Sequence, residues 1–302
     1  MPTPLIIDTD AGYDDLLAVL YLLGDPSFSI EAVTVVYGLT TDLLLAGNVL
    51  RHVLEQTGNE RVPVYLGSTT PLPGGHTVPQ SWANKVAHLG WPKPKTGPLR
   101  GAVAYLEQAI FECVTPQILA LGPLTNLAAA LGSQRHHDRL QIRMMGGAFG
   151  LDGRQAIGNM EDAEPSAPHS EFNVYIDPSA ARQIFARVPN IFAVPLNACS
   201  MVPIDEQFIS DFEAISSDSP RTVLAKAVFD RISAYNEESL KSGQYFAWDP
   251  LAVVESALRE RVSMTVSVDD LGVTSRSGPG PVTVALAADP AEFRSAFFRG
   301  FS

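Results

Sequence analysis

Four carboxylates stand close together near the start of the chain. Asp8, Asp10, Asp14 and Asp15 fall within eight residues, directly behind a short apolar run that predicts a strand. Carboxylates a few ångström apart repel one another unless a cation or a shared proton relieves the charge. A helix N-terminus helps only by roughly 0.3–1 kcal/mol per charge. The pattern therefore predicts a site for a hard divalent cation, which prefers oxygen ligands.

Two other structures are compatible with the same acidic turn. One or two such acids are typical of helix caps and of first helical turns. The second alternative is a metal-dependent phosphatase, in which Asp8 is the nucleophile and Asp10 the acid. An EF-hand loop is excluded, because the twelfth position counted from Asp8 or Asp10 is Val19 or Tyr21 rather than Glu.

Short apolar runs recur along the chain, with helix-like stretches between them. Strands are predicted at residues 5–7, 30–36, 62–66, 117–121, 141–145 and 191–194. Helices are predicted at residues 14–23, 102–111 and 124–131. This alternation predicts a Rossmann-like α/β fold, with a mostly parallel central sheet flanked by helices. Ligands of such folds bind at the carboxyl ends of the strands, where the acidic turn would lie.

Three irregular stretches interrupt the alternation of strands and helices. They span residues 68–98, 150–170 and 242–250. The first two exceed ordinary loop lengths, and long loops in compact domains are commonly functional, so we expect loops of an active site there. Neither a repeat nor a linker divides the chain, so a single domain over residues 1–302 is predicted.

The composition narrows the classes of partner and compartment. The formal net charge of −12 disfavours binding to nucleic acid and to anionic membrane surfaces. The chain has no apolar run long enough to cross a membrane and no secretory leader pattern, so we expect a cytoplasmic protein. Cys113 and Cys199 have no paired spacing, which favours free thiols over a disulfide or a zinc site.

A set of ordered motifs resembles the inosine-uridine-preferring nucleoside hydrolase family. The acidic turn resembles the family's Asp-x-Asp-Pro-Gly-x-Asp-Asp, with Ala11 in place of the proline. Further motifs follow in the family's order across nearly the whole chain. They are Gly122-Pro123-Leu124-Thr125-Asn126, Met145-Gly146-Gly147-Ala148, Gly158-Asn159, Glu171-Phe172-Asn173-Val174, Asp177-Pro178 and Trp248-Asp249-Pro250-Leu251-Ala252.

This resemblance implies a calcium-dependent hydrolase of nucleosides, with a defined set of site residues. One Ca²⁺ would be held by Asp10, Asp15, the carbonyl of Thr125 and Asp249. Asp10 would also take the proton of the attacking water, which suits cleavage through an oxocarbenium-like sugar. The expected ribose ligands are Asp14 and Asn173 for the 2′- and 3′-hydroxyls, and Asn159 and Glu171 for the 5′-hydroxyl.

Two tryptophans bear on the choice of base. Many relatives carry His before the final Asp, but this chain has Trp248, and an indole cannot act as a general acid. Trp248 and Trp82 resemble the purine-specific branch of the family, in which two indoles enclose the base. A purine preference is therefore predicted, with pyrimidine or broad specificity as the alternative. Trp91 is the alternative partner for stacking, and His88 is an alternative acid.

Two further departures concern positions near the expected site. Most relatives have Asn after the glycine that follows the second strand, and this Asn contacts the ribose, whereas here Leu39 follows Gly38. The contact is then lost or supplied by the neighbours of Leu39 at positions 40–42. Asn197 stands where the family commonly has Asp.

The activity and the assembly leave other outcomes open. A non-catalytic nucleoside-binding protein on the same fold is a second rival to the hydrolase, beside the phosphatase. Intact residues at Asp10, Asp15, Thr125 and Asp249 favour the enzyme. The resemblance implies a homodimer or homotetramer, acting on small nucleosides.

Overall fold

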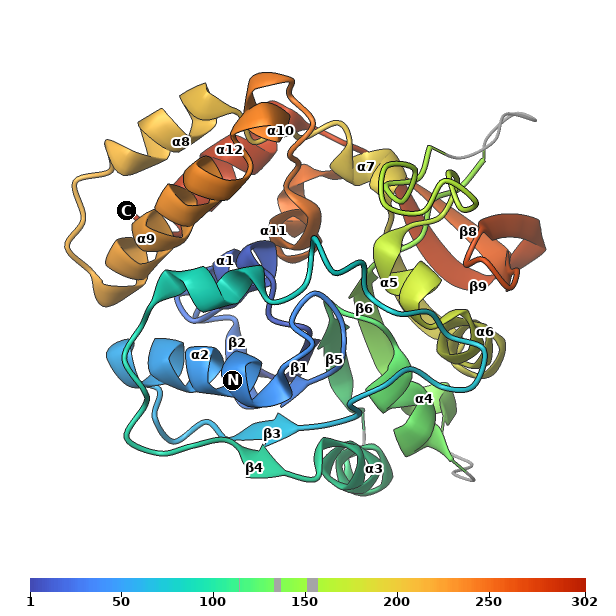
Figure 1. The fold of residues 1–302 in the computed structure, drawn as a ribbon. Coiled ribbons are helices and arrows are strands. Elements are labelled where there is room, and N and C mark those ends of the chain that lie inside the picture. The colour runs from blue at the N-terminus through green and yellow to red at the C-terminus, as the bar shows by residue number, and fades with distance from the viewer. Residues whose placement is uncertain (114, 133–136, 151–156) are drawn as a thin grey trace.

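The computed structural model describes residues 1–113, 115–132, 137–150 and 157–302. In this part of the chain nine strands form one sheet (Figure 1). Neighbouring strands run parallel except for β8 and β9, which pair antiparallel at one edge. In spatial order the strands are β4 (Leu99–Arg100), β3 (Val64–Leu66), β2 (Phe28–Val35), β1 (Thr3–Thr9), β5 (Gln117–Ala120), β6 (Gln141–Met145), β7 (Asn190–Val194), β9 (Thr274–Ala288) and β8 (Leu258–Val268).

Helices cover both faces of this sheet (Figure 1). One face packs against α1 (Tyr13–Leu22), α2 (Leu43–Gln56), α7 (Leu196–Cys199), α8 (Glu206–Glu213), α9 (Pro220–Tyr235), α10 (Glu237–Lys241), α11 (Trp248–Val253) and α12 (Pro290–Arg299). The other packs against α3 (Ala102–Glu112), α4 (Thr125–Leu131) and α6 (Pro178–Arg187), with α5 (Phe172–Ile176) near its edge. Short 3₁₀ turns are η1 (Lys85–Leu89), η2 (His137–Arg139) and η3 (Glu255–Ala257). This confirms the predicted α/β fold.

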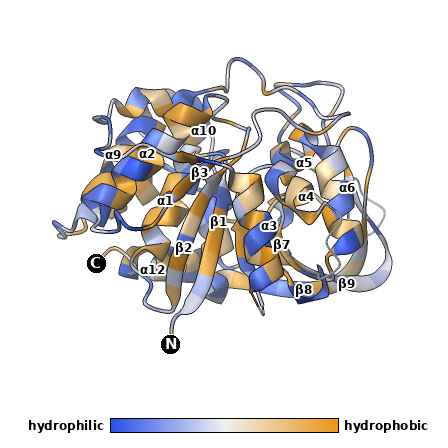
Figure 2. Ribbon diagram, turned by 90° about the horizontal axis from the view of Figure 1, so that it is seen from below, coloured by the Kyte–Doolittle hydropathy of each residue, from blue (hydrophilic) through white to orange (hydrophobic). Residues whose placement is uncertain are grey.

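Alternation along the strands places apolar side chains in two separate cores. Leu5 and Ile7 of β1 point into the core under α1, whereas Ile6 points into the core under α4. Because both faces are covered, the inner strands read as continuous apolar runs, which is why they were predictable. Figure 2 shows β1 and β2 as mainly hydrophobic ribbons between the helices.

The edge strands were not predicted, because they lack such continuous apolar runs. β8 and β9 carry exposed residues along much of their length, so neither strand has the apolar run of a buried parallel strand. Both residues of β4 are exposed, and the strand is too short to carry a pattern. The sheet is therefore larger than the predicted one, and the additional strands lie at its two edges.

The three predicted loops differ in structure. Residues 68–98 contain η1 but are otherwise irregular, and of the loop at 150–170 the residues 151–156 lie outside the described part. The loop prediction at 242–250 is wrong at its end, because Trp248 already begins α11. A proline at the third position of this helix costs nothing, since the first turn lacks internal N–H bonds.

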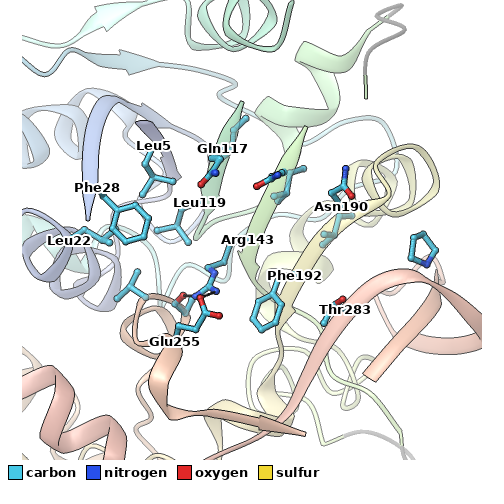
Figure 3. A pocket seen from close by; sticks show the side chains of 17 residues that line it. Leu5, Leu22, Phe28, Gln117, Leu119, Arg143, Asn190, Phe192, Glu255 and Thr283 are labelled. Carbon is cyan, nitrogen blue, oxygen red and sulfur yellow. Dashed lines mark hydrogen bonds and ion pairs between the residues drawn. The ribbon is translucent and has the colours of Figure 1, made fainter. Parts of the chain in front are cut away.

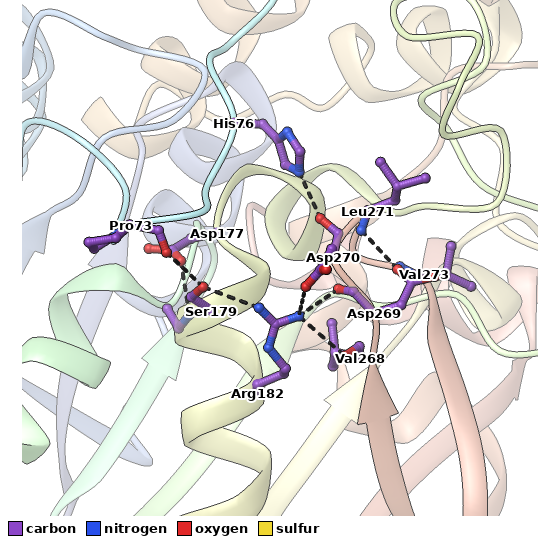
Figure 4. Close-up of polar contacts among 11 residues, drawn as sticks. Pro73, His76, Asp177, Ser179, Arg182, Val268, Asp269, Asp270, Leu271 and Val273 are labelled. Carbon is purple, nitrogen blue, oxygen red and sulfur yellow. Dashed lines mark hydrogen bonds and ion pairs between the residues drawn. The ribbon is translucent and has the colours of Figure 1, made fainter.

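Polar contacts anchor the first of these loops (Figure 4). The carbonyl of Pro73 accepts a hydrogen bond from Ser179 of α6, and a ring nitrogen of His76 lies 2.9 Å from the carbonyl of Asp270. Arg182 joins the same turn, donating to the carbonyl of Asp269 and the carboxylate of Asp270. The loop is thereby held against α6 and the turn between β8 and β9.

Candidate functional site

The acidic residues of the first turn meet a residue from the far end of the chain. Asp10 follows β1, Asp14 and Asp15 open α1, and Asp249 lies in the first turn of α11, which packs against α1. One carboxylate oxygen from each of Asp14, Asp15 and Asp249 lies within 4.8 Å of the others. The structure therefore brings the last motif onto the first, at the carboxyl ends of the central strands.

Burial makes this arrangement costly for charged groups. Burial, followed by the charge of Asp15, raises the pKa values of Asp10 and Asp249 well above their ordinary range. The same two causes raise the pKa of Asp14 to about 7. Among the described residues, the buried Oδ1 of Asp249 has no hydrogen-bond partner. Crowded carboxylates with an unpartnered oxygen fit a hard divalent cation, which would satisfy that oxygen and offset the repulsion.

Backbone groups orient two of these carboxylates. Asp15 accepts hydrogen bonds from the hydroxyl of Thr9 and from the backbone N–H of Gly12, at 3.0 Å for the latter. Asp10 accepts one through Oδ2 from the backbone N–H of Leu39, at 2.7 Å. A Cβ on Gly38 would lie 2.0 Å from that oxygen, so only glycine fits there. The backbone that follows β2 thereby fixes the orientation of the Asp10 carboxylate through Oδ2.

The backbone at Ala11 explains the absence of proline from this turn. Ala11 is fully buried and has a φ of 57°, in the left-handed region, while proline is locked near −65°. The N–H of Ala11 also donates to Thr9 Oγ1 at 3.0 Å, a bond that proline lacks.

We expect Ala11→Pro to lower the free energy of unfolding by about 3 kcal/mol or more, because it changes φ and removes this bond. Ala11→Gly is the matched control. It should leave the free energy of unfolding unchanged or raise it by up to about 1 kcal/mol, since glycine enters the left-handed region without strain. Urea unfolding measures both variants. A proline variant as stable as the parent would contradict the left-handed turn.

Thr125 lies at the start of α4, directly behind β5. Its hydroxyl donates to Asp177 at 2.7 Å, and Asp177 in turn caps α6 through the N–H of Ala180. Leu124 is the N-cap residue of this helix, and no side chain caps it.

Asp8 points away from the other acids, into the sheet. Its Oδ1 accepts hydrogen bonds from Thr34 at 2.6 Å and from Asn126 at 2.8 Å. Burial raises its pKa to about 7, against the lowering effect of these two bonds. Its buried Oδ2 has no hydrogen-bond partner among the described residues.

Two of the residues expected to bind ribose, Glu171 and Asn173, also make hydrogen bonds within the protein. Glu171 caps α5, and its carboxylate accepts from the backbone N–H groups of Asn173, Val174 and Gly147. The amide of Asn173 donates to the carbonyl of Leu121 at 2.9 Å. These bonds place Glu171 and Asn173 beside the strand ends, where the acidic residues also lie.

Asn159 reaches the same region from the second loop. Its Oδ1 accepts a hydrogen bond from the backbone N–H of Phe172 at 2.9 Å. Within the described residues its Nδ2 donates no hydrogen bond, and neither does Oδ1 of Asn173 accept one. These two atoms therefore keep unused hydrogen-bonding capacity.

The two tryptophans lie in different aromatic groups. Trp82 packs at a tilt on Phe172, with ring centroids 5.9 Å apart. Trp248 makes edge contacts with Tyr245 and Phe246, at 4.9 and 6.1 Å, and its buried Nε1 has no hydrogen-bond partner among the described residues. Each indole is half-buried against protein.

The alternative aromatic residues pack elsewhere. Trp91 lies 5.2 Å from the ring of His52 on α2, and it packs against the core on that side. His88 is exposed and stacks on Tyr235 at the end of α9, at 4.3 Å. These contacts favour Trp82 over Trp91 as a residue of the site, and they give His88 no role beside the acidic residues.

The neighbours of Leu39 are also engaged within the protein. Thr40 donates to the carbonyl of Ala11 at 3.1 Å, Thr41 accepts from the amide of Asn84, and Asp42 caps α2. Thr40 therefore bonds the backbone of the acidic turn, whereas Thr41 and Asp42 bond Asn84 and the start of α2. The amide of Asn197 bonds both the N–H and the carbonyl of Phe149, which an aspartate could not do.

Sequence reasoning missed Tyr245 as a residue of the site. This tyrosine is buried, and its pKa is raised well above the usual range by burial and then by the charges of Asp14 and Asp249. Its phenol therefore borders the acidic residues. The available signal was its place four residues before Asp249 in the same motif.

A hollow of about 470 Å³ lies elsewhere, at the amino ends of β5, β6 and β7 (Figure 3). It is lined by Gln117, Arg143 and Phe192, among others, and by none of the residues predicted for the site. Arg143 is paired with Glu255 there. Because ligands of parallel α/β sheets bind at the opposite edge, this hollow is separate from the acidic site.

Comparisons with known proteins agree with the motifs. A family model described as inosine-uridine preferring nucleoside hydrolase matches residues 5–295. The pyrimidine-specific ribonucleoside hydrolase RihA of Salmonella paratyphi A is 30% identical over 244 residues, covering 79% of this chain and 74% of the relative. Uridine nucleosidase 1 of Arabidopsis thaliana is 31% identical over 264 residues, covering 83% and 72%.

Solved structures show the same fold. A plant nucleoside hydrolase, PpNRh1, superposes with a TM-score of 0.83 at 29% identity, over 100% of this chain and 99% of that one. A purine-preferring ribonucleoside hydrolase from Gardnerella vaginalis gives 0.82 at 22% identity, over 99% and 98%. At that identity the second likeness concerns the fold alone. None of the helices in the described part is long and apolar enough to cross a membrane.

Proposed function

Because the chain belongs to the inosine-uridine preferring nucleoside hydrolase family, we propose that it hydrolyses the N-glycosidic bond of ribonucleosides to ribose and free base. The convergence of Asp14, Asp15 and Asp249 supports this proposal most directly. These residues come from both ends of the chain, and within the described residues no cationic side chain pairs with them. Burial of such carboxylates is unfavourable unless they bind a ligand.

Calcium is the cation that this donor set suits best. All the donors are oxygens, and we propose that Asp10, Asp15, the Thr125 carbonyl and Asp249 hold the ion, with Asp14 beside them. Bound calcium would lower the pKa of the attacking water and orient the ribose hydroxyls. Because calcium polarises water less than zinc does, a carboxylate base is still needed.

Asp10 is proposed as that base. Its Oδ2 is fixed by the N–H of Leu39, so Oδ1 can accept the proton while the side chain keeps its orientation. Asn173, Asn159 and Glu171 are proposed to hold the sugar, through atoms left over from their structural bonds. The cleaved bond joins the anomeric carbon to the base nitrogen, and the water oxygen replaces that nitrogen.

For the nucleobase of the substrate, we propose a preference for pyrimidines or a broad specificity. The purine preference suggested by Trp82 and Trp248 has no counterpart in the names of RihA and uridine nucleosidase 1, which are 30% and 31% identical to this chain. The two indoles also lie in separate aromatic groups, each packed on protein. Trp248 remains the residue that replaces the expected histidine, so leaving-group protonation must come from another group or from solvent.

A panel of nucleosides tests the base preference. We expect ribose release from uridine and cytidine at rates equal to or above those for inosine, adenosine and guanosine, measured as reducing sugar. Trp248→Ala should then reduce all rates by similar factors, because the indole packs against Tyr245 instead of selecting one base. Hydrolysis restricted to purines, with a loss in Trp248→Ala confined to them, would restore the purine assignment.

The phosphatase alternative is not favoured by the structure. Asp8, its nucleophile, has Oδ1 bonded to Thr34 and Asn126, which leaves Oδ2 as the one oxygen without a partner among the described residues. A phosphate would also need a cationic clamp. The nucleoside panel together with a nucleotide distinguishes the two activities. Release of phosphate from the nucleotide, without ribose release from the nucleosides, would overturn the proposed function.

A further inference from the structure

The side-chain amide of Asn126 joins four parts of the fold. Asn126 is fully buried at the second position of α4. Its Nδ2 donates to Oδ1 of Asp8 at 2.8 Å and to the carbonyl of Val35 at 3.1 Å, at the ends of β1 and β2. Its Oδ1 accepts from the backbone N–H of Ser68, just past β3, at 2.8 Å. The amide of Asn126 thus donates through Nδ2 and accepts through Oδ1 at the same time.

These contacts lie next to residues proposed for catalysis. Asp8 precedes Asp10 by two residues on the same strand end, and Thr125 precedes Asn126 directly. Val35 leads into the segment whose Leu39 N–H orients Asp10. The distance between Asp10 and the Thr125 carbonyl, which come from different elements, is therefore set partly through the Asn126 amide.

Close packing shows that this position tolerates little change. A Cβ on Gly67 would lie 2.2 Å from Oδ1 of Asn126, so the backbone past β3 approaches the amide closely. A carboxylate at position 126 would keep the shape but would face the carboxylate of Asp8 and could not donate to Val35. Only an amide satisfies a carboxylate, a carbonyl and an N–H at once.

We propose that Asn126 is a positioning residue of the hydrolytic site, which fixes the Asp10 turn against the Thr125 carbonyl through its bonds to Asp8, Val35 and Ser68. This inference rests on the proposed function, because it concerns the same site. In this role Asn126 itself binds neither substrate nor cation. It acts through the ligands, as residues that orient metal ligands commonly do.

Asn126→Asp tests the proposal in the full-length protein. We expect the dissociation constant for Ca²⁺, measured by calorimetry without substrate, to rise by about 10- to 100-fold. With calcium saturating, kcat for uridine should fall by at least about 10-fold, with KM changed by less than about 3-fold, because the sugar ligands stay in place. Asn59→Asp is the matched control, since within the described residues the side chain of Asn59 bonds only Thr57, in the turn after α2. It should leave all three values unchanged.

A second variant separates positioning from general damage. In the exchanged pair Asp8→Asn with Asn126→Asp, the amide at position 8 can donate to the carboxylate at position 126, which still accepts from Ser68. This pair should recover at least about 5-fold of the lost calcium affinity and of kcat. If Asn126→Asp alone does not fold, the exchanged pair is measured in its place.

The outcomes are distinct from those of the proposed function. A parent protein that releases ribose, together with an Asn126→Asp variant of unchanged calcium affinity and kcat, would overturn the positioning role. So would an exchanged pair that folds with the parent melting temperature but recovers neither value. A parent protein that releases no ribose refutes the proposed function instead, while the calcium titration still tests the contact.

Discussion

Asp10→Asn should lower kcat for nucleoside hydrolysis by about 10²- to 10⁴-fold with calcium saturating, because general-base transfer is typically worth that factor. Asparagine keeps an oxygen that can accept the Leu39 N–H, which lies 2.7 Å from Asp10 Oδ2. It cannot take up a proton from water. The change therefore removes the base and keeps the geometry of the turn.

Asp25→Asn is the matched control for this measurement. Asp25 bonds the N–H of Ser27 in the exposed turn between α1 and β2, at the far end of the sheet. It should keep the activity of the parent, measured as reducing sugar. Because Asp10 is also a proposed ligand, calcium affinity is titrated in both proteins, so that loss of the ion is distinguished from loss of the base. A kcat for Asp10→Asn within about 5-fold of the parent would refute the assignment.

Removal of calcium should abolish activity, and it should destabilise the protein in a pH-dependent way. Burial raises the pKa values of Asp8 and Asp14 to about 7, above the ordinary value of 3.8. Between these pH values the folded state holds protons that the unfolded chain has released. The calcium-free protein therefore loses stability as pH rises from about 4 to about 7. The contribution of Asp8 and Asp14 to the free energy of unfolding is therefore largest below about pH 4.

Bound calcium favours the ionised carboxylates and reverses this trend. At 100 times its dissociation constant, calcium adds about 2.7 kcal/mol to the free energy of unfolding, or about 4 °C in melting temperature for a chain of this size. We expect that shift at pH 8 and less than about 1 °C at pH 5, where protons compete for the same oxygens. Thermal melts of the protein in chelator and of the protein with added calcium measure the shift at each of the two pH values. An equal shift at the two pH values would contradict binding at these carboxylates.

Local patterns in the sequence were sufficient for the centre of the fold. The buried parallel strands have continuous apolar runs and the acidic turn follows one of them, so both the sheet and the place of its binding edge were predictable. The edge strands β8 and β9 were not, because their half-exposed residues give no such run. The ordered motifs also identified the family, which the comparisons confirm.

Individual roles depended on contacts that no local pattern contains. The sequence alone indicated four acids near residue 10 and a remote Asp249, but only the packing of α11 on α1 brought Asp249 to Asp14 and Asp15. Motif residues such as Glu171 proved to have structural bonds as well, since a side chain's partners are set by three-dimensional neighbours.

The same distinction holds for Asn126 and for the tryptophans. The residue type of Asn126 and its motif were visible in the sequence. Its bonds to Asp8, Val35 and Ser68 exist only because three strand ends and α4 converge. Likewise, the surroundings of Trp82 and Trp91 followed from loop packing, which depends on long-range contacts. The sequence by itself determined the fold class, the family and the acidic turn, because short-range patterns encode them. Tertiary structure decided which atoms meet, because those distances arise from segments far apart in the chain.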